Sequence, residues 1–266
     1  MLLQLIKNSW GKMMKQSREE NMLHYLEQHE YLSTEKAVEI FQVSPATIRR
    51  IFTKLAENNS ARRVRGGVRR LSPGANASIP FLMREQWFAS EKALLAKRAM
   101  EFVPPDGVIF IHSGSTTLYM GNHIANETVI TDSTALCELL RTRFPSGGPQ
   151  VIVAGGTYDL KAGAIAGSRA ASVIMQYHAN VAFFSARGMD DEGILDTNDE
   201  LAAVARSMVT RAERVVMLAD HSKFREFGMS RMVLWNRIHF LITTDFPDNY
   251  PFFRKIEQAG VKIILI

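Results

Sequence analysis

The segment between residues 43 and 68 constrains the fold of this chain most strongly, because it places a capped amphipathic helix after a tight turn. Ser44 can cap a helix that begins with Pro45, since the first helical turn needs no amide hydrogen from its first residue. Apolar side chains then recur at the i, i+3, i+4, i+7 spacing of one helix face: Ile48, Ile51, Phe52 and Leu55. A turn followed by such a helix is typical of a helix-turn-helix.

Positive charge is concentrated in the same region. Between residues 43 and 72 the chain has eight Arg or Lys side chains and one acid, Glu57. The first 72 residues carry a net charge of +6 and the remainder a net charge of −1, in a chain whose total is +5. A local excess of this kind indicates a surface that binds the phosphates of a nucleic acid.

The neighbouring segments supply the rest of a small DNA-binding domain. Residues 17–29 and 33–41 have the caps and apolar spacing of two further helices. Residues 61–64 and 68–71 can pair as a hairpin across the turn at 65–67. We therefore expect residues 14–71 to form a winged helix-turn-helix, with Met13 or Met14 as an alternative start of the chain.

Two kinds of DNA contact are expected from this domain. Thr47, Arg49 and Arg50 point away from the apolar stripe, toward base edges or nearby phosphates. The full set of candidate DNA-binding residues is Ser44, Ala46, Thr47, Arg49, Arg50, Lys54, Arg62, Arg63 and Arg65, the last four as phosphate ligands. The alternative is a helical bundle with a solvated basic face, but the coincidence of cap, stripe, wing and charge favours DNA binding.

The recognition segment from Ser44 to Arg50 and the turn Arg65-Gly66-Gly67 are similar to the DNA-binding domain of the DeoR family of bacterial transcription regulators. Three positions depart from the family pattern. Ile51 replaces the usual acidic residue, Asn59 a frequent glycine and Arg65 a frequent histidine. These departures keep the arginines, so the resemblance still implies DNA binding, with a shifted operator preference.

A second domain follows a small, polar, turn-rich stretch, which predicts an interdomain linker at 72–84. Helical patterns cover 85–102, 116–124, 134–143 and 201–211. They alternate with seven apolar segments that we expect to be strands: 108–112, 128–131, 151–154, 181–186, 215–219, 240–243 and 262–265. Such alternation predicts an α/β domain at 85–266, a Rossmann-like, mostly parallel sheet with helices on both faces.

Ligands of such sheets bind beyond the carboxyl ends of the strands, and polar residues follow five of the expected strands here. The candidate ligand-binding residues are Ser113, Gly114, Ser115, Thr116, Thr117, Thr131, Asp132, Ser133, Gly155, Gly156, Asp190, Asp220 and Lys223. The glycine and hydroxyl turn at 113–117 suits a phosphate, carboxylates can accept sugar hydroxyls, and Lys223 can neutralise an anion. Each residue alone is equally compatible with helix capping or turn formation, and His112 is better read as a structural histidine.

Residues 113–117, 131–133, 155–156 and 220–224 resemble the effector-sensing domain of the same family, so the likeness spans about residues 16–245. The resemblance implies a fold like that of ribose-5-phosphate isomerase and a phosphorylated sugar as the effector. It also implies that residues 113–117 hold the phosphate, while carboxylates and Lys223 surround the sugar. Two departures lie in this site: His112 stands where the family usually has aspartate, and Asp132 where it usually has asparagine.

We therefore expect a cytoplasmic transcription regulator, a repressor that binds operator DNA as a dimer or tetramer and is released by a phosphorylated sugar. A sugar-phosphate isomerase and a DNA-binding protein without ligand control are the alternatives. No cofactor or metal is expected: the single cysteine, Cys137, excludes most cysteine-based zinc sites, and the 113–117 turn lacks the lysine of an ATP-binding loop. No apolar run is long enough to cross a membrane.

Overall fold

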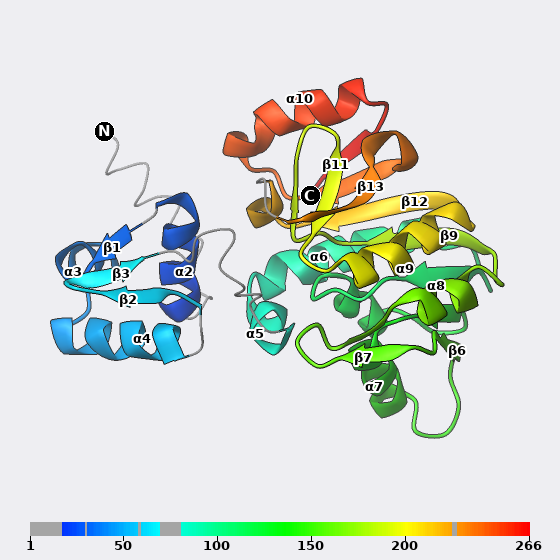
Figure 1. Cartoon of the computed structure of the whole chain (residues 1–266), viewed down its shortest axis with the longest axis horizontal. Coiled ribbons are helices and arrows are strands. Elements are labelled where there is room, and N and C mark those ends of the chain that lie inside the picture. The colour runs from blue at the N-terminus through cyan, green and yellow to red at the C-terminus, as the bar shows by residue number, and fades with distance from the viewer. Residues whose placement is uncertain (1–17, 30, 58–59, 70–80, 225–227) are drawn as a thin grey trace. The chain divides into compact units, whose positions relative to one another are not determined.

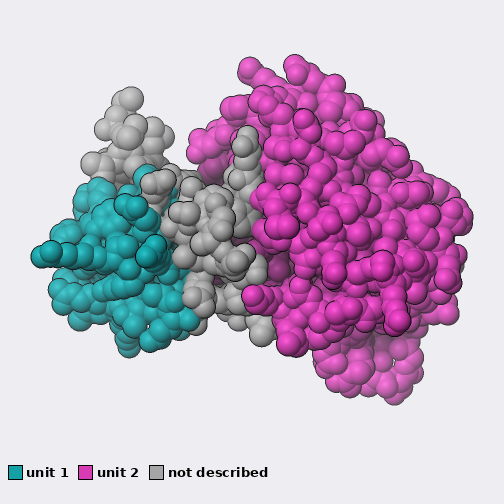
Figure 2. All heavy atoms as spheres, in the orientation of Figure 1, with its two compact units in different colours: residues 1–79 teal, residues 80–266 magenta. Residues whose placement is uncertain are grey.

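The computed structural model describes residues 18–29, 31–57, 60–69, 81–224 and 228–266. The chain divides into two compact units, residues 1–79 and 80–266, which Figure 2 distinguishes by colour. Most of the linker expected at 72–84 lies outside the described residues, as does Asn59. The end of that stretch is not linker, because Phe81 begins helix α5 (Phe81–Gln86).

The first unit contains the three expected helices, α2 (Arg18–Gln28), α3 (Thr34–Phe41) and α4 (Pro45–Glu57). Ser33 caps α3, because its side chain accepts a hydrogen bond from the amide of Lys36 at 3.0 Å. Gln42 ends the helix in the left-handed conformation, with φ of 51°. The apolar stripe predicted for α4 is buried along its whole length, so the helix packs by the face that its sequence spacing defines.

The predicted wing is present, as strands β2 (Arg62–Val64) and β3 (Gly67–Arg69), paired antiparallel. A third strand, β1 (Tyr31–Ser33), pairs with β3 on its other side. Strand β1 was not predicted, because three residues between two helices are too few to show a clear alternation of apolar and polar side chains. The wing is therefore anchored to the helical core through the segment that joins α2 to α3.

The second unit is built on one seven-stranded sheet in which every neighbouring pair is parallel (Figure 1). The strand order is β15-β14-β12-β9-β4-β5-β6. These strands are β4 (Val108–Ile111), β5 (Thr128–Thr131), β6 (Gln150–Val153), β9 (Ala179–Phe184), β12 (Ala212–Ala219), β14 (Phe240–Thr243) and β15 (Lys262–Leu265). Each of the seven predicted strands is confirmed, and so is the mostly parallel α/β architecture.

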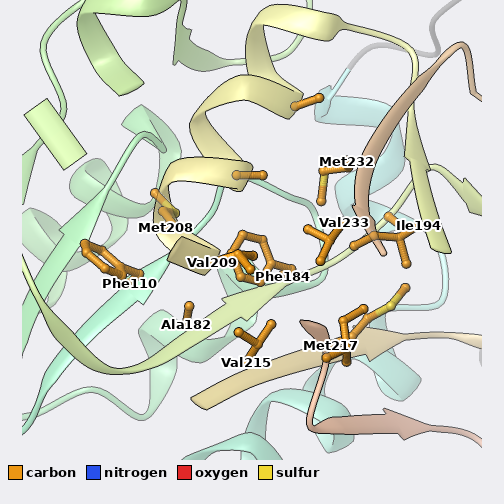
Figure 3. Close-up of a cluster of buried hydrophobic side chains, with 14 of the residues drawn as sticks. Phe110, Ala182, Phe184, Ile194, Met208, Val209, Val215, Met217, Met232 and Val233 are labelled. Carbon is orange, nitrogen blue, oxygen red and sulfur yellow. The ribbon is translucent and has the colours of Figure 1, made fainter. Parts of the chain in front are cut away.

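Alternate residues of the central strands enter two separate cores, one on each face of the sheet. Figure 3 shows the first core, where Phe110 and Phe184 pack with Met208 and Val209 of helix α9 (Asp199–Thr210). Their chain neighbours, such as Ile109 and Phe183, belong to the second core on the opposite face. Helices α8 (Ser168–Ile174) and α10 (Tyr250–Gln258) contribute to the first core, and α6 (Ala89–Ala99) and α7 (Thr134–Arg143) to the second.

Two helical predictions need correction. The helix expected at 85–102 is three pieces, namely α5, α6 and the 3-10 turn η1 (Met100–Phe102). The break falls before α6, where Phe88 adopts a left-handed φ of 53° and buries its ring 4.6 Å, centroid to centroid, from the ring of His221. The helix expected at 116–124 is the 3-10 segment η2 (Thr117–Asn122).

Short strands beside the main sheet were not predicted. Hairpin β7 (Thr157–Asp159) and β8 (Ala164–Ala166) follows β6. A small antiparallel sheet combines β10 (Gly188–Met189), β11 (Gly193–Asp196) and β13 (Ser230–Leu234). Strands of two to five residues are too short for a clear period-two pattern. In the part of the chain that the structure describes, no helix is long and apolar enough to cross a bilayer.

Gly67 is required where β3 passes close to β1. A Cβ atom there would lie 2.3 Å from the backbone oxygen of Leu32, so we expect Gly67→Ala to destabilise the wing by about 2 kcal/mol. Amide hydrogen exchange should show faster exchange across β1 to β3. Gly155→Ala is the matched control, since its Cβ would meet nothing within 4 Å; unchanged protection in Gly67→Ala would contradict the packing described here.

Candidate functional site

Helix α4 presents the polar face that the sequence predicts for DNA contact. Ser44, Ala46, Arg49 and Arg50 are exposed, and Thr47 is half-buried. Ser44 Oγ accepts a hydrogen bond from the amide of Thr47 at 3.2 Å and lies 3.0 Å from Thr47 Oγ1. The capping interaction therefore fixes the start of α4 and orients both hydroxyls at the end of the helix that recognition helices turn toward base edges.

The basic side chains of α4 differ in their surroundings. Arg49 and Arg50 form no ion pair with any of the described residues. Lys54 Nζ lies 2.7 Å from Glu19 Oε1 on α2, and both side chains are partly exposed. The two arginines are therefore available to phosphates or bases, whereas Lys54 has to share its charge with a carboxylate of its own domain.

The wing carries a row of exposed arginines. Arg62, Arg63 and Arg65 are exposed, and the guanidinium of Arg63 lies 5.4 Å from the ring centroid of Phe52 on α4. Arg69 is exposed as well and sits directly opposite Arg62 in the β2–β3 register. Arg69 belongs to the charge cluster in the sequence but was not among the predicted contacts. The register adds it to the cationic surface, because cross-strand neighbours share a face.

In the second unit, the carboxyl ends of β4 and β5 bring two predicted residues into direct contact. Asp132 is fully buried; its Oδ1 accepts from the amide of Ser113 at 2.7 Å and its Oδ2 from the hydroxyl of Ser113 at 2.8 Å. His112 Nε2 lies 3.5 Å from Asp132 Oδ2 and 3.3 Å from the backbone oxygen of Leu201. The two positions that depart from the family pattern are therefore neighbours.

Several predicted hydroxyls build this edge of the sheet. Thr131 Oγ1 donates to the backbone oxygen of Ile111 at 2.6 Å and accepts from the amide of Ser133 at 3.0 Å. Ser133 Oγ accepts from the amide of Leu136 at 3.2 Å and so caps α7. Thr117 Oγ1 donates to the backbone oxygen of His112 at 2.7 Å. These bonds hold the turn in shape and leave other groups to meet a ligand.

The hydroxyls of the turn at 113–117 also reach the neighbouring strand and helix. Ser185, which directly follows β9, donates through Oγ to Thr116 Oγ1 at 3.2 Å. Lys92 Nζ of α6 donates to Ser115 Oγ at 3.2 Å and to the backbone oxygen of Arg84 on α5. Helices α5 and α6 therefore supply cationic residues to the same sheet edge, next to the turn that the sequence assigns to a phosphate.

Lys92 is a candidate site residue that the sequence analysis missed. It is buried with Leu95, Ala96 and Ala99 on one face of α6. A lysine at an apolar position of an amphipathic helix was the available signal, because such a residue is rarely buried without a charged partner. Arg84, on the preceding helix, has no comparable signal in the sequence; only the fold brings it here.

Four cationic residues lie with the buried carboxylate of Asp220 at this sheet edge, namely Lys92, Lys223, Arg84 and Arg187, and we call this group the cationic cluster. Burial lowers the pKa of Lys92 to about 7, and the charges of Lys223 and Arg84 act in the same direction, against Asp220 and Glu91. Burial alone would raise the pKa of Asp220, but Lys223, Lys92 and His221 hold it well below its ordinary value. Lys223 Nζ lies 3.8 Å from Asp220 Oδ2. At neutral pH the carboxylate of Asp220 is therefore ionised, and Lys92 is protonated in only part of the molecules.

The positive side of the cluster extends to a third strand end. Burial, followed by the positive charge of Arg187, lowers the pKa of Arg84 to about 9, while Asp196 raises it. Arg187 lies just after β9, beside Ser185 and Ala186. Cations from two helices and two strand ends are therefore close enough to repel one another. An anionic ligand between them would relieve that repulsion.

The buried polar atoms at this edge that have no hydrogen-bond partner among the described residues include Nδ1 of His112 and Oδ2 of Asp220. Buried groups of this kind normally bond to protein, water or ligand. Nδ1 of His112 can donate a hydrogen bond to a hydroxyl or accept one from it, depending on the tautomer of the ring. Oδ2 of Asp220 can only accept a hydrogen bond while the carboxylate is ionised. Together with the cations, they suit a ligand that carries both an anion and hydroxyl groups.

The remaining predicted residues are not joined to this cluster by any contact that the described residues show. Asp190 Oδ1 accepts from the amides of Glu192 and Gly193 at 2.9 and 3.0 Å and pairs with Arg231, so it closes a turn. Gly156 allows close passage of β8, because a Cβ would lie 2.7 Å from the backbone oxygen of Ala166. Gly155 is exposed with nothing near its Cβ position. Within the described ranges, no three His, Cys, Asp or Glu side chains gather as a metal site.

Removing the charge of Asp220 should destabilise the second unit. Asp220→Asn leaves Lys92 and Lys223 without the carboxylate between them, so we expect a loss of about 2 to 3 kcal/mol near pH 6, where Lys92 is protonated. The loss should shrink as pH rises through 7, because Lys92 then becomes neutral. Thermal unfolding across this pH range measures both effects.

The exposed variant Asp199→Asn is the matched control, because its carboxylate pairs with Arg206 at the surface. A combined Lys92→Met and Asp220→Asn variant should recover part of the stability. Equal melting temperatures for Asp220→Asn and the wild type at pH 6 would show that the cluster does not depend on this carboxylate.

Comparisons with known proteins add two family matches to this geometry. Residues 18–73 match the model of a DeoR-like helix-turn-helix domain, and residues 87–245 match that of a DeoR C-terminal sensor domain. The matched ranges include α4, the wing and all strand ends of the cationic cluster. Lys92 falls inside the second range, and Arg84 lies just before it.

Individual proteins are similar along nearly the whole chain. The glycerol-3-phosphate regulon repressor of Haemophilus influenzae is 28% identical over 260 residues, covering 95% of this chain and 98% of that protein. The transcriptional regulator IolR of Bacillus subtilis is 28% identical over 255 residues, covering 94% and 100%. Among solved structures, ribose 5-phosphate isomerase A from Neisseria gonorrhoeae is 19% identical with a TM-score of 0.35, covering 50% of this chain and 52% of that one.

Proposed function

The chain belongs to the DeoR family of transcription regulators, and from this premise we propose that it represses its target genes by binding operator DNA as a symmetric oligomer. A phosphorylated sugar, bound by the cationic cluster of the second unit, releases it from the DNA. The observation that carries the proposal is the pairing, in one chain, of an exposed basic winged helix-turn-helix with a set of buried cations at a sheet edge. Such a protein works where the operator DNA is, in the cytoplasm.

The DNA contacts follow from exposure and charge. Helix α4 enters the major groove with Thr47, Arg49 and Arg50 toward base edges, because these side chains lie opposite the buried stripe of the helix. The arginines of the wing and Lys54 hold the phosphates on either side, which positions the domain and adds salt-dependent affinity. Two copies related by a two-fold axis would read half-sites about one helical turn apart.

The effector site combines an anion subsite with hydroxyl subsites. Lys92, Arg84, Arg187 and Lys223 supply the positive charge, and the turn from Ser113 to Thr117 supplies backbone amides and hydroxyls. Asp132 and Asp220 can accept hydrogen bonds from hydroxyl groups of the sugar. One relative is a glycerol-3-phosphate regulon repressor, and glycerol 3-phosphate is a phosphorylated polyol, which supports this class of ligand.

Release from DNA requires that the effector favour one conformation over another. Arg84 and Lys92 stand on α5 and α6, the first helices of the second unit along the chain. A phosphate that draws these two side chains toward residues 113–117 acts on the part of the chain that leads from the DNA-binding unit. We propose this displacement as the link between effector binding and operator release.

An isomerase activity does not fit this chain, because the family to which it belongs consists of transcription regulators rather than enzymes. A DNA-binding protein without ligand control is the remaining alternative, and the operator experiments distinguish it.

Replacing Arg49 and Arg50 by alanine should abolish specific operator binding. Each arginine that contacts a base or phosphate is worth about 1–3 kcal/mol, so the double variant is expected to bind operator DNA at least 100-fold more weakly. Fluorescence anisotropy with a labelled operator measures the dissociation constant, and the salt dependence should become shallower.

The control for this pair is Lys36→Ala, which removes an exposed cation from α3, where it pairs with Glu39. It should change operator affinity by less than threefold, about what one exposed ion pair contributes. Undiminished operator binding by the arginine double variant would overturn the assignment of α4 as the recognition helix.

The pKa of Lys92 gives the effector site a distinctive pH dependence. An anionic ligand favours protonated Lys92, so effector affinity should be full below pH 7 and fall as pH rises through the free protein's pKa of about 7. Between pH 7 and 8.5 we expect a loss of roughly tenfold. Lys92→Arg should bind with little change over this range, because its guanidinium stays charged. The same slope in both proteins would remove Lys92 from the effector site.

A further inference from the structure

A second hollow lies in the second unit, apart from the cationic cluster. It is a groove of about 690 Å³ between α5, η2, α7 and the β7–β8 hairpin. Its floor and sides are mainly apolar, formed among others by Phe81, Leu118, Leu139, Tyr158 and Leu160. Charged residues also line it, the acids Glu85 and Glu138 and the base Lys161. We call this feature the hairpin groove.

The hairpin at its border holds an apolar side chain out into solvent. Leu160, at the tip, is 84% exposed, and Tyr158 is 49% exposed. The tip is nevertheless firmly built, because Asp159 Oδ1 accepts from the amides of Lys161 and Ala162 at 2.8 and 2.9 Å. A leucine held at a fixed, exposed position beside an apolar groove is expected where a partner covers both.

The tip is also fastened to the rest of the unit. The amide of Phe81 donates to the backbone oxygen of Lys161 at 3.2 Å, and Thr134 Oγ1 donates to the backbone oxygen of Gly163 at 2.9 Å. The surface is therefore shaped before any partner arrives, which lowers the entropic cost of forming a contact.

The charges in the hairpin groove indicate what the partner is. Glu138 is already paired with Arg141, 2.6 Å from Nη2 to Oε1, so Glu85 and Lys161 are the lining charges that form no ion pair with the described residues. Lys161 forms no ion pair within the part of the chain that the structure describes. Lys161 follows Leu160 in the chain, so a partner surface that binds Leu160 in an apolar groove also needs an acidic group for Lys161. The hairpin groove of a second copy offers both, because it is mainly apolar and is lined by Glu85.

We propose that the hairpin groove is a contact between two copies of this chain. Leu160 of each copy lies in the groove of the other, and Lys161 of each copy meets Glu85 of the other. The projecting leucine and the hollow belong to one surface patch, which is what a two-fold, isologous contact needs. Its charges complement one another across the same axis, because each copy brings both signs.

This contact deepens the proposed function, since it supplies the two-fold axis that reading two operator half-sites requires. The contact is nevertheless testable without DNA. Its failure would leave operator binding by α4 open, and a dimer that binds no DNA would leave the contact in place.

The direct test is the oligomeric state of Leu160→Asp. Sedimentation velocity of the full chain, at several concentrations and without DNA, measures the dimer dissociation constant. Two leucines leave their grooves and two carboxylates enter beside acids, so we expect that constant to rise about 100-fold or more. The control is Leu234→Asp, another exposed leucine, at the end of β13 and outside the groove, which should dimerise as the wild type does.

A charge exchange tests the same contact without touching the apolar residues. Lys161→Glu should weaken the dimer about tenfold, because it faces Glu85 across the axis. Adding Glu85→Lys should restore most of the affinity. Circular dichroism and melting temperature establish that each variant is folded, so loss of the dimer is not confused with unfolding.

The outcomes are decisive in both directions. A wild-type dimer that Leu160→Asp and Lys161→Glu dissociate, and that the charge exchange restores, establishes the contact. A wild type that stays monomeric at tens of micromolar, or a dimer that both variants leave intact, overturns it. So does a small molecule from the effector panel that binds to the groove and is lost in Leu160→Asp while the oligomeric state is unchanged.

Discussion

The attraction between Asp220 and the cations around it is the interaction on which the second unit depends. Its carboxylate is fully buried and ionised, and it holds Lys92 and Lys223 at a sheet edge where burial opposes their charge. The cations Lys92, Lys223, Arg84 and Arg187 interact there with the acids Asp220, Glu91 and Asp196. In the proposed function an anionic ligand binds among these cations, so stability and ligand affinity draw on the same groups.

The parallel sheet makes this arrangement possible. Strands β4, β9 and β12 lie side by side, so the residues that follow them meet although they are far apart in the sequence. Two apolar cores, one on each face, fix the strands and leave the carboxyl edge for polar groups; Figure 3 shows the first of these cores. In the first unit, the buried stripe of α4 and the three-stranded sheet of β1, β2 and β3 fix the backbone that carries the exposed arginines.

Most of this frame is visible in the sequence, because it depends on local patterns. The cap at Ser44, the stripe of α4 and the seven apolar strands each have a clear period or a clear boundary residue. The break at Phe88 and strand β1 could not be predicted, since both depend on contacts with distant residues. Only part of the proposed effector site is visible in the sequence. The strand-end turns are local signals, whereas Arg84 joins them only through the packing of α5. Asp190, also predicted for this site, closes a turn and pairs with Arg231.

In the proposed function, a phosphorylated ligand at the cationic cluster controls DNA binding. The most direct measurement is fluorescence anisotropy on DNA from upstream of its own and neighbouring operons, with sugars titrated in as matched phosphorylated and unphosphorylated pairs. We expect sequence-selective binding that one phosphorylated sugar weakens and its unphosphorylated counterpart leaves unchanged. Selective binding that no phosphorylated sugar alters would contradict this expectation and leave the cluster as a structural feature of the sheet edge.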